Sequence, residues 1–283
     1  MADTTRIPSL SILTETGEGQ AYLSEQYGVV LDNVQNSLIS TIFKNDDISG
    51  DITSGTVIAT KLAYGEPEDY GTARNRGSAQ KIKAKQIPIQ MNPPKEFIYE
   101  VSEADTRMFG VTGLVERKMA ITQEDLFYYL DTEFWKEAVA TGKVLTPAGD
   151  TVAAKCDAAI VDLESYKDEF VRGVPRDRIG LVLTPAAYTA LQGNIDLIHN
   201  VLTGNDYECF HKVRVFCSTN LPEGSDGILL AKKSIAQPWF PIEVPAGKIP
   251  LSIDYAFGFD VSQATQATSP ELIRVLKGLV TAA

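Results

Sequence analysis

Two strand patterns joined by a long polar segment restrict the fold of this chain more than any other feature. The stretch TVIATKLA at residues 56–63 is rich in β-branched residues, and KIKAKQIPI at residues 81–89 alternates lysine with uncharged residues, which is typical of a strand. Glycines and a proline mark the segment between them as a polar tip, so the sequence predicts a two-stranded ribbon about 40 residues long. A lone two-stranded hairpin is only marginally stable in water. We therefore expect neighbouring chains to hold this ribbon, the alternative being a surface hairpin with solvated charges.

The predicted ribbon concentrates positive charge in an acidic chain. The 283 residues have a formal net charge of -11, yet no acid lies between Tyr70 and Pro94. The bases in this run are Arg74, Arg76, Lys81, Lys83 and Lys85. Residues 1–55, in contrast, hold eight acids and two bases. Because segments of opposite charge attract one another, we predict that the five bases form a contact between copies of the chain.

The bulk composition narrows the class of protein. A hydrophobic content of 44% and a charged content of 22% are typical of a globular protein with a substantial core. No run of about 18 apolar residues predicts a membrane span, and the first 20 residues lack a signal-peptide pattern. We therefore expect synthesis in the cytoplasm without export or membrane insertion. The acidic balance argues against a general nucleic-acid binder, which needs a basic face.

Periodicity predicts several helices and a succession of short strands. Apolar residues at intervals of three and four predict helices over residues 21–43 and 153–171. The strongest helix signal begins at a capping box of Thr122 and Asp125, continues through Leu126, Leu130 and Phe134, and ends near Gly142. A strand at residues 179–183 leads into a short helix at Pro185, and short strands follow. Helices and strands are mixed without a βαβ repeat, so the sequence predicts an α+β fold.

No pattern in the chain predicts a catalytic, cofactor or metal site. The three cysteines, Cys156, Cys209 and Cys217, are too few for a disulfide framework, so we expect reduced thiols. Cys209, His211 and Cys217 lack the CxxC spacing of a structural zinc site, and alternation along FHKVRVFC predicts that His211 shares a strand face with Val213. Walker A, GxGxxG, GxSxG and HExxH motifs are missing from the sequence. We therefore expect neither an enzyme nor a bound cofactor or metal.

The order of these elements resembles the HK97-fold major capsid proteins of tailed bacteriophages. The resemblance covers nearly the whole chain and rests on the polar arm and helix, the charged ribbon, the dominant helix and the late segments GLVLTPAAYTALQ and DGILLAKKSIA. It implies an N-terminal arm with a helix at residues 1–50 and a β-hairpin E-loop at residues 51–100. It further implies a P-domain at residues 101–175 and 251–283, with a spine helix over about 113–143, and a compact A-domain at residues 176–250.

The resemblance also implies a function and partners. It implies a structural protein that self-assembles through pentamers and hexamers into an icosahedral shell, with the E-loop lying across a neighbouring subunit. The shell of the virion would enclose double-stranded DNA without sequence-specific binding, and an acidic wall avoids tight binding to that DNA. No long charged segment precedes the arm, so a separate scaffolding protein is expected, beside a portal.

Three other classes of protein remain open at this stage. An encapsulin-type compartment shares the fold and would enclose an enzyme instead of DNA. A tail protein or another virion component is the second alternative. An enzyme with an unrecognised site is the third, and turnover in a substrate screen would identify it.

Overall fold

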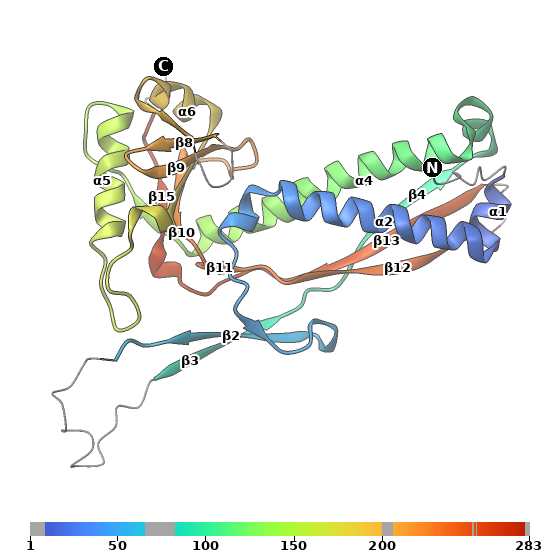
Figure 1. Cartoon of the computed structure of the whole chain (residues 1–283), viewed down its shortest axis with the longest axis horizontal. Helices are drawn as coiled ribbons and strands as arrows, with labels where there is room; N and C mark the ends of the chain where they lie inside the picture. Colours follow the sequence, from blue (N-terminus) through green and yellow to red (C-terminus); the bar gives the residue numbers. More distant parts are fainter. Residues whose placement is uncertain (1–8, 66–82, 200–205, 251, 253, 281–283) are drawn as a thin grey trace, which may run out of the picture. The chain divides into compact units, whose positions relative to one another are not determined.

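The computed structural model of the chain describes residues 9–65, 83–199, 206–250, 252 and 254–280 (Figure 1). The chain divides into two compact units. Unit 1 comprises residues 1–41, 91–131 and 238–264, and unit 2 comprises residues 42–90, 132–237 and 265–283. Each unit has a hydrophobic core of its own. The observed mixture of helices and largely antiparallel sheets confirms the predicted α+β class.

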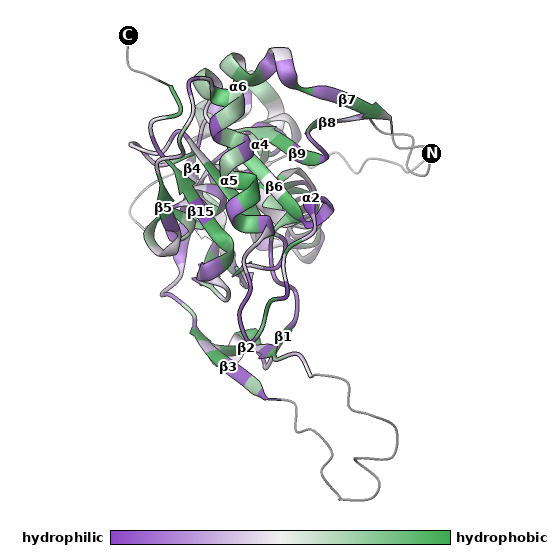
Figure 2. Cartoon of the chain, turned by 90° about the vertical axis from the view of Figure 1, so that its left-hand side faces the viewer, coloured by the Kyte–Doolittle hydropathy of each residue, from purple (hydrophilic) through white to green (hydrophobic). Residues whose placement is uncertain are grey.

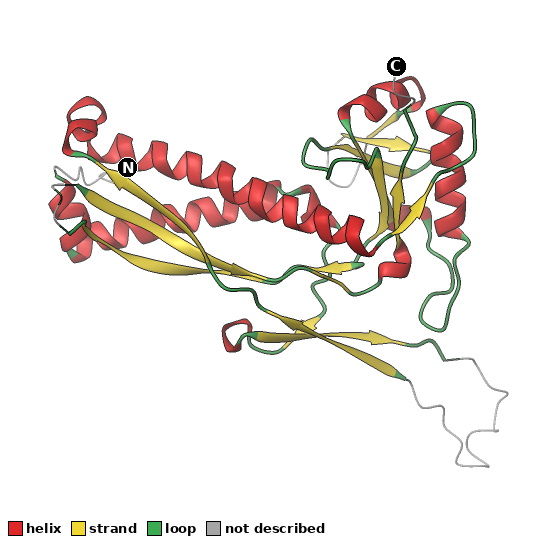
Figure 3. Ribbon diagram, turned by 180° about the vertical axis from the view of Figure 1, so that it is seen from behind, coloured by secondary structure: helices red, strands yellow, loops and turns green. Residues whose placement is uncertain are grey.

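Unit 1 packs helices on one face of a three-stranded antiparallel sheet. The helices are α1 (Leu10–Glu15), α2 (Gly17–Ser37) and the first part of α4 (Glu103–Thr141). The sheet has the order β12 (Trp239–Lys248), β13 (Tyr255–Gln263), β4 (Lys95–Val101). Figures 1 and 3 show α2 and α4 running along the sheet. Alternate strand residues, among them Val101, Phe257 and Phe259, form one buried cluster with Leu114 and Leu126 of α4.

The long helix α4 starts earlier than the sequence predicted. Its backbone is helical from Glu103 except at Gly110, whose φ of 70° and ψ of 163° bend the chain. Glycine suits this position because L side chains rarely adopt that conformation. The predicted cap at Thr122 is wrong: Thr122 is buried within the helix, and its hydroxyl donates to the Lys118 carbonyl (2.9 Å). The helix continues through Thr122 because this local hydrogen bond satisfies the hydroxyl without ending the helix.

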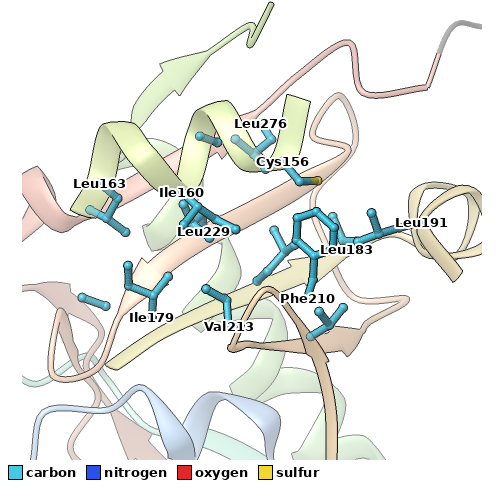
Figure 4. Packing of buried hydrophobic residues seen from close by; sticks show 14 of the residues in the cluster. Cys156, Ile160, Leu163, Ile179, Leu183, Leu191, Phe210, Val213, Leu229 and Leu276 are labelled. Atoms are coloured by element: carbon cyan, nitrogen blue, oxygen red, sulfur yellow. The ribbon is translucent and has the colours of Figure 1, made fainter. Parts of the chain in front are cut away.

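Unit 2 is built on a seven-stranded mixed sheet. Its order is β5 (Lys143–Leu145), β15 (Ile273–Leu276), β10 (Gly227–Ala231), β6 (Ile179–Leu183), β9 (Val213–Cys217), β8 (Asp206–Phe210), β7 (Asp196–His199). The strand predicted at residues 179–183 is confirmed as β6, which is buried along its whole length. Helices α5 (Val152–Glu164) and α6 (Pro185–Leu191) contribute to the core, and Figure 4 shows Ile160 and Leu163 of α5 beside Leu229 of β10.

Two smaller sheets complete unit 2. The first contains the two predicted ribbon strands, β2 (Thr56–Leu62) and β3 (Ala84–Gln90), and a third strand, β1 (Ile48–Ser49), which pairs with β2 and which the sequence did not predict. The second pairs β11 (Ile235–Ala236) with β14 (Gln266–Ala267). Short 3₁₀ turns occur at Ile39–Ile42, Ile52–Ser54, Arg176–Arg178, Gln192–Asn194 and Pro270–Leu272.

Two predicted helices end before the apolar spacing does. The first ends at Ser37, and Leu38 is already extended. The second, α5, ends at Glu164, although the 3-4 spacing continues to Phe170. There the Asp168 carboxylate accepts the backbone N–H groups of Phe170 and Val171, each at 2.7 Å. This side-chain hydrogen bonding offers the backbone an alternative to the helix and forms a loop at residues 165–172.

Candidate intersubunit ribbon

The ribbon has two chemically different faces. The register pairs Lys61 with Lys85, Ala59 with Ile87 and Val57 with Ile89. Directly paired residues lie on the same face of a sheet, and Val57, Ala59 and Ile89 are each only 1% exposed. The apolar part of this inner face is therefore buried, and its charged positions are lysines. Figure 2 shows the described strands β2 and β3 coloured by hydropathy.

The inner face is anchored through Lys61. The Lys61 ammonium forms an ion pair with the Glu271 carboxylate, and the side chains are only 16% and 23% exposed. The same ammonium lies 5.0 Å from the centre of the Phe170 ring. Glu271 belongs to the 3₁₀ turn Pro270–Leu272, and Phe170 to the loop at residues 165–172. The ribbon therefore has support from within its own unit, which the sequence did not reveal.

The loop at residues 165–172 holds the far end of the described ribbon. Arg172 donates from Nη2 to the Gly65 carbonyl (2.9 Å), and its guanidinium lies 5.2 Å from the centre of the Tyr64 ring. The backbone N–H of Tyr64 donates to the Glu169 carbonyl (3.4 Å). These contacts, together with Lys61, attach the C-terminal end of β2 to other segments of unit 2. No spacing in the sequence links this loop to the ribbon, which lies about 100 residues earlier.

Of the five predicted contact residues, Lys83 and Lys85 lie in the part of the chain that the structure describes. The Lys83 ammonium lies 2.5 Å from the Glu169 carboxylate, and both side chains are more than half exposed. The hydrogen bond that Lys83 donates to the Glu169 carboxylate, followed by the negative charge of that carboxylate, raises the pKa of Lys83. Lys85 is exposed and has no ion pair with any described residue. Arg74, Arg76 and Lys81 lie outside the described residues.

The outer face of the ribbon carries no charge at its described positions. Thr60 and Leu62 on β2 lie opposite Gln86 and Ala84 on β3, and Leu62 is 59% exposed. The Ala63 N–H donates a hydrogen bond to the Lys83 carbonyl (2.8 Å), so Lys83 and every second residue after it on β3 direct their backbone N–H and C=O groups toward β2. By that alternation the backbone nitrogen of Pro88 faces the free edge of β3. Proline lacks an N–H there, so it interrupts strand addition at this edge.

Cys209, His211 and Cys217 do not lie together on one strand face, because His211 belongs to a turn. His211 and Lys212 have positive φ angles of 47° and 72° and form the turn between β8 and β9. The prediction that His211 shares a strand face with Val213 is therefore wrong, because the strand begins only after this turn. The His211 ring instead stacks on Phe210 and places Nδ1 2.6 Å from Asp157 Oδ1.

The cysteines lie in surroundings that disfavour the thiolate. Burial raises the pKa of Cys156 to about 12, and burial also raises the pKa values of Cys209 and Cys217. Across the described ranges no three His, Cys, Asp or Glu side chains gather as a metal-ion site. None of the helices in those ranges combines the length and apolar character that a membrane span requires.

Comparison with known proteins identifies the fold. No protein-family profile and no curated protein sequence matches the chain. The capsid structure of the cyanophage P-SCSP1u aligns with a TM-score of 0.58 and 10% identity, over 83% of this chain and 86% of that chain. The mature capsid of bacteriophage PhiM1 aligns with a TM-score of 0.51 and 11% identity, over 79% and 82% of the two chains. A virus-like particle from Pyrococcus furiosus aligns with a TM-score of 0.54 and 16% identity, over 90% and 99%. The chain therefore has the fold of phage capsid structures, which confirms the HK97-like fold that the resemblance implied.

Proposed function

We propose that this chain is a structural protein that assembles with copies of itself into a capsid shell. The observation that carries the proposal is the fold shared with phage capsid structures over most of both chains. A second observation supports it: β2 and β3 form a thin ribbon whose outer face is uncharged and exposed. Such a surface gains stability when another chain covers its apolar side chains.

The finer proposal is a major capsid protein of a tailed phage. Its copies form pentamers and hexamers in an icosahedral shell that encloses double-stranded DNA, with a separate scaffolding protein and a portal as partners. Synthesis takes place in the host cytoplasm and the final location is the virion. The net charge of -11 supports the absence of tight DNA binding, because each phosphate that a protein neutralises adds affinity through counterion release.

The same proposal assigns a role to each predicted segment of the chain. Residues 1–50 act as the arm, residues 51–100 as the E-loop, residues 101–175 and 251–283 as the P-domain, and residues 176–250 as the A-domain. Arg74, Arg76, Lys81 and Lys85 of the E-loop contact a neighbouring copy. Lys83 has the Glu169 carboxylate of its own chain within reach, so its contact with a neighbour requires an exchange of partners.

Assembly of the purified chain tests the proposal directly. We expect sedimentation and negative-stain microscopy to show closed shells, rings of five or six copies, or irregular sheets. The chain is tested alone and after co-expression with the genes adjacent to its own, which include any separate scaffold. A chain that stays monomeric at high concentration in both cases would falsify the proposal.

A second candidate is the shell of a protein compartment. The virus-like particle from Pyrococcus furiosus favours it, since the alignment with that structure covers 90% of this chain and 99% of that chain. The content of particles purified from the native source separates the two functions. Nuclease-protected double-stranded DNA supports the phage capsid, whereas an enclosed enzyme supports the compartment.

A further inference from the structure

A cavity of about 340 Å³ lies at one end of unit 1, between α1, α4 and β13. Figures 1 and 3 show α1 and the first turns of α4 at the same end of the sheet. Gly110, the residue at which α4 bends, lines the cavity, and a Cβ built on it would meet no atom outside its own stretch of helix within 4 Å. Small-molecule pockets have volumes of roughly 300–1,000 Å³, so this cavity has room for one small ligand.

The polar groups that line the cavity favour an anionic ligand. Arg107 of α4 is exposed, and none of the acids in the described ranges forms an ion pair with its guanidinium. The other polar side chains of the lining are hydroxyl groups, from Ser9, Ser11, Thr106 and Tyr255. No carboxylate of a described residue lines the cavity, although the whole chain has 37 acids and 26 bases. A guanidinium among hydroxyl donors suits an oxyanion.

Two of these hydroxyl groups are held in place by local hydrogen bonds. The Ser9 and Ser11 hydroxyl oxygens lie 3.1 Å apart, so one hydroxyl donates to the other, and the one that accepts keeps its own proton for a ligand. The backbone N–H of Ile12 also donates to the Ser9 hydroxyl (3.4 Å). The start of α1 therefore presents a hydroxyl donor to the cavity without a rearrangement of the chain.

The acids that lie near the lining residues in the sequence are held by serines. Asp105 of α4 accepts hydrogen bonds from the Ser102 hydroxyl (2.9 Å) and from the Ser102 N–H (3.4 Å). Asp254, just before β13, accepts a hydrogen bond from the Ser252 hydroxyl (2.8 Å). Neither carboxylate lines the cavity, so neither neutralises the charge of Arg107 there.

We propose that this cavity binds a small phosphate monoester, with Arg107 and the surrounding hydroxyl groups holding the phosphate. Donors from α1, α4 and β13 approach from three elements, which suits a tetrahedral group with oxygens in several directions better than a planar carboxylate. The guanidinium matches phosphate oxygens through paired hydrogen bonds. Leu10 and Val111, which are only 4% and 5% exposed, form the apolar part of the wall and contact the organic part of the ester. The inference goes beyond the proposed function, because binding requires one chain and no assembly.

Calorimetric titration of the full chain with phenyl phosphate tests the assignment. The buffer contains no other phosphate and its ionic strength is constant, because salt screens the attraction of an exposed cation. We expect saturable binding of one phenyl phosphate per chain. Arg107→Gln should weaken it about tenfold or more, because the charge-assisted hydrogen bonds are lost, and Ser11→Ala about two- to tenfold, because one neutral donor is lost. Circular dichroism must show that each variant is folded.

A matched control separates the cavity from a general effect of charge. Lys95→Gln removes one positive charge from an exposed position on β4 of the same unit, and we expect it to change the dissociation constant less than about twofold. Equal weakening in Arg107→Gln and Lys95→Gln, or a wild-type chain without saturable binding, would overturn the inference.

Three other probes identify what the cavity selects. We expect inorganic phosphate to bind more weakly than phenyl phosphate, because it makes no contact with the apolar wall, and benzoate to bind more weakly because its carboxylate is planar. A deoxyoligonucleotide without a terminal phosphate should also bind more weakly. Benzoate or the oligonucleotide binding as tightly as phenyl phosphate would overturn the assignment, the second by indicating nucleic acid as the source of the phosphate.

Methyl NMR spectra locate the ligand without a substitution. In chain labelled at its leucine and valine methyl groups, phenyl phosphate should shift the signals of Leu10 and Val111, which line the cavity. The signals of Val101, a buried residue of β4 that does not line it, should stay in place. Shifts confined to other methyl groups would place the ligand elsewhere and refute the inference. These measurements involve no assembly, so their failure leaves the proposed function untouched.

Discussion

The anchoring of the ribbon by Lys61 leads to a quantitative prediction. Lys61→Met keeps the apolar stem of the side chain but removes the ion pair with Glu271 and the cation above the Phe170 ring. An exposed pair contributes about 0–1 kcal/mol, whereas removing one partner of a fully buried pair costs about 3–5 kcal/mol. The Lys61 and Glu271 side chains are 16% and 23% exposed, between these limits. We therefore expect the free energy of opening the ribbon to fall by about 1–3 kcal/mol.

Hydrogen exchange measured by mass spectrometry on dilute, unassembled protein detects this change. A loss of about 1–3 kcal/mol corresponds to amide exchange about 5- to 150-fold faster in peptides that cover β2 and β3. Lys83→Met is the matched control, because its pair with Glu169 is mostly exposed and we expect it to leave the exchange unchanged. Peptides from the buried strand β6 should exchange at the wild-type rate in both variants. Equal exchange rates of the ribbon in Lys61→Met and Lys83→Met, or exchange in β6 accelerated as strongly as in the ribbon, would contradict this prediction.

Two further changes probe the core of unit 2. Burial of Asp162 raises its pKa, but the hydrogen bond and charge of Arg274, helped by the charge of Lys143, outweigh burial and lower the pKa below the usual 3.8. The ion pair between Asp162 and Arg274 therefore stabilises the fold above about pH 4. Its contribution is lost as the pH falls through the lowered pKa. Urea unfolding should show Asp162→Asn less stable than wild type at pH 7, with a smaller difference at pH 3, and a constant difference would contradict this. Gly180→Ala places a Cβ 2.2 Å from two Phe43 ring carbons, so we expect a loss of about 1–3 kcal/mol and a lower melting temperature. Gly28→Ala, in open space on α2, should be neutral or stabilising by up to about 1 kcal/mol, and equal losses in both would disprove the steric reason.

The candidate site could be predicted from the sequence only in part. The charge run that marks the ribbon is visible in the sequence, because it requires only that five bases occur without an acid. Their counter-charges are not visible. Glu169 and Glu271, which pair with Lys83 and Lys61, are ordinary acids in irregular segments more than 80 residues further along the chain. The pairing of Asp260 with Glu96 is not visible for the same reason, because only the pairing of β13 with β4 brings these two acids together.

Local patterns by themselves determined the type and approximate place of most elements. Alternation identified the strands of the ribbon, and spacing of three and four identified α2, α5 and the later part of α4, because burial of one face imposes a period on the sequence. The tertiary structure alone decided where these elements end and which charges meet. Thr122 lies inside a helix, where its hydroxyl donates to the Lys118 carbonyl, and His211 lies in the tight turn around which β8 and β9 pair. Contacts between distant segments depend on how those segments pack together, and no local period in the sequence records that packing.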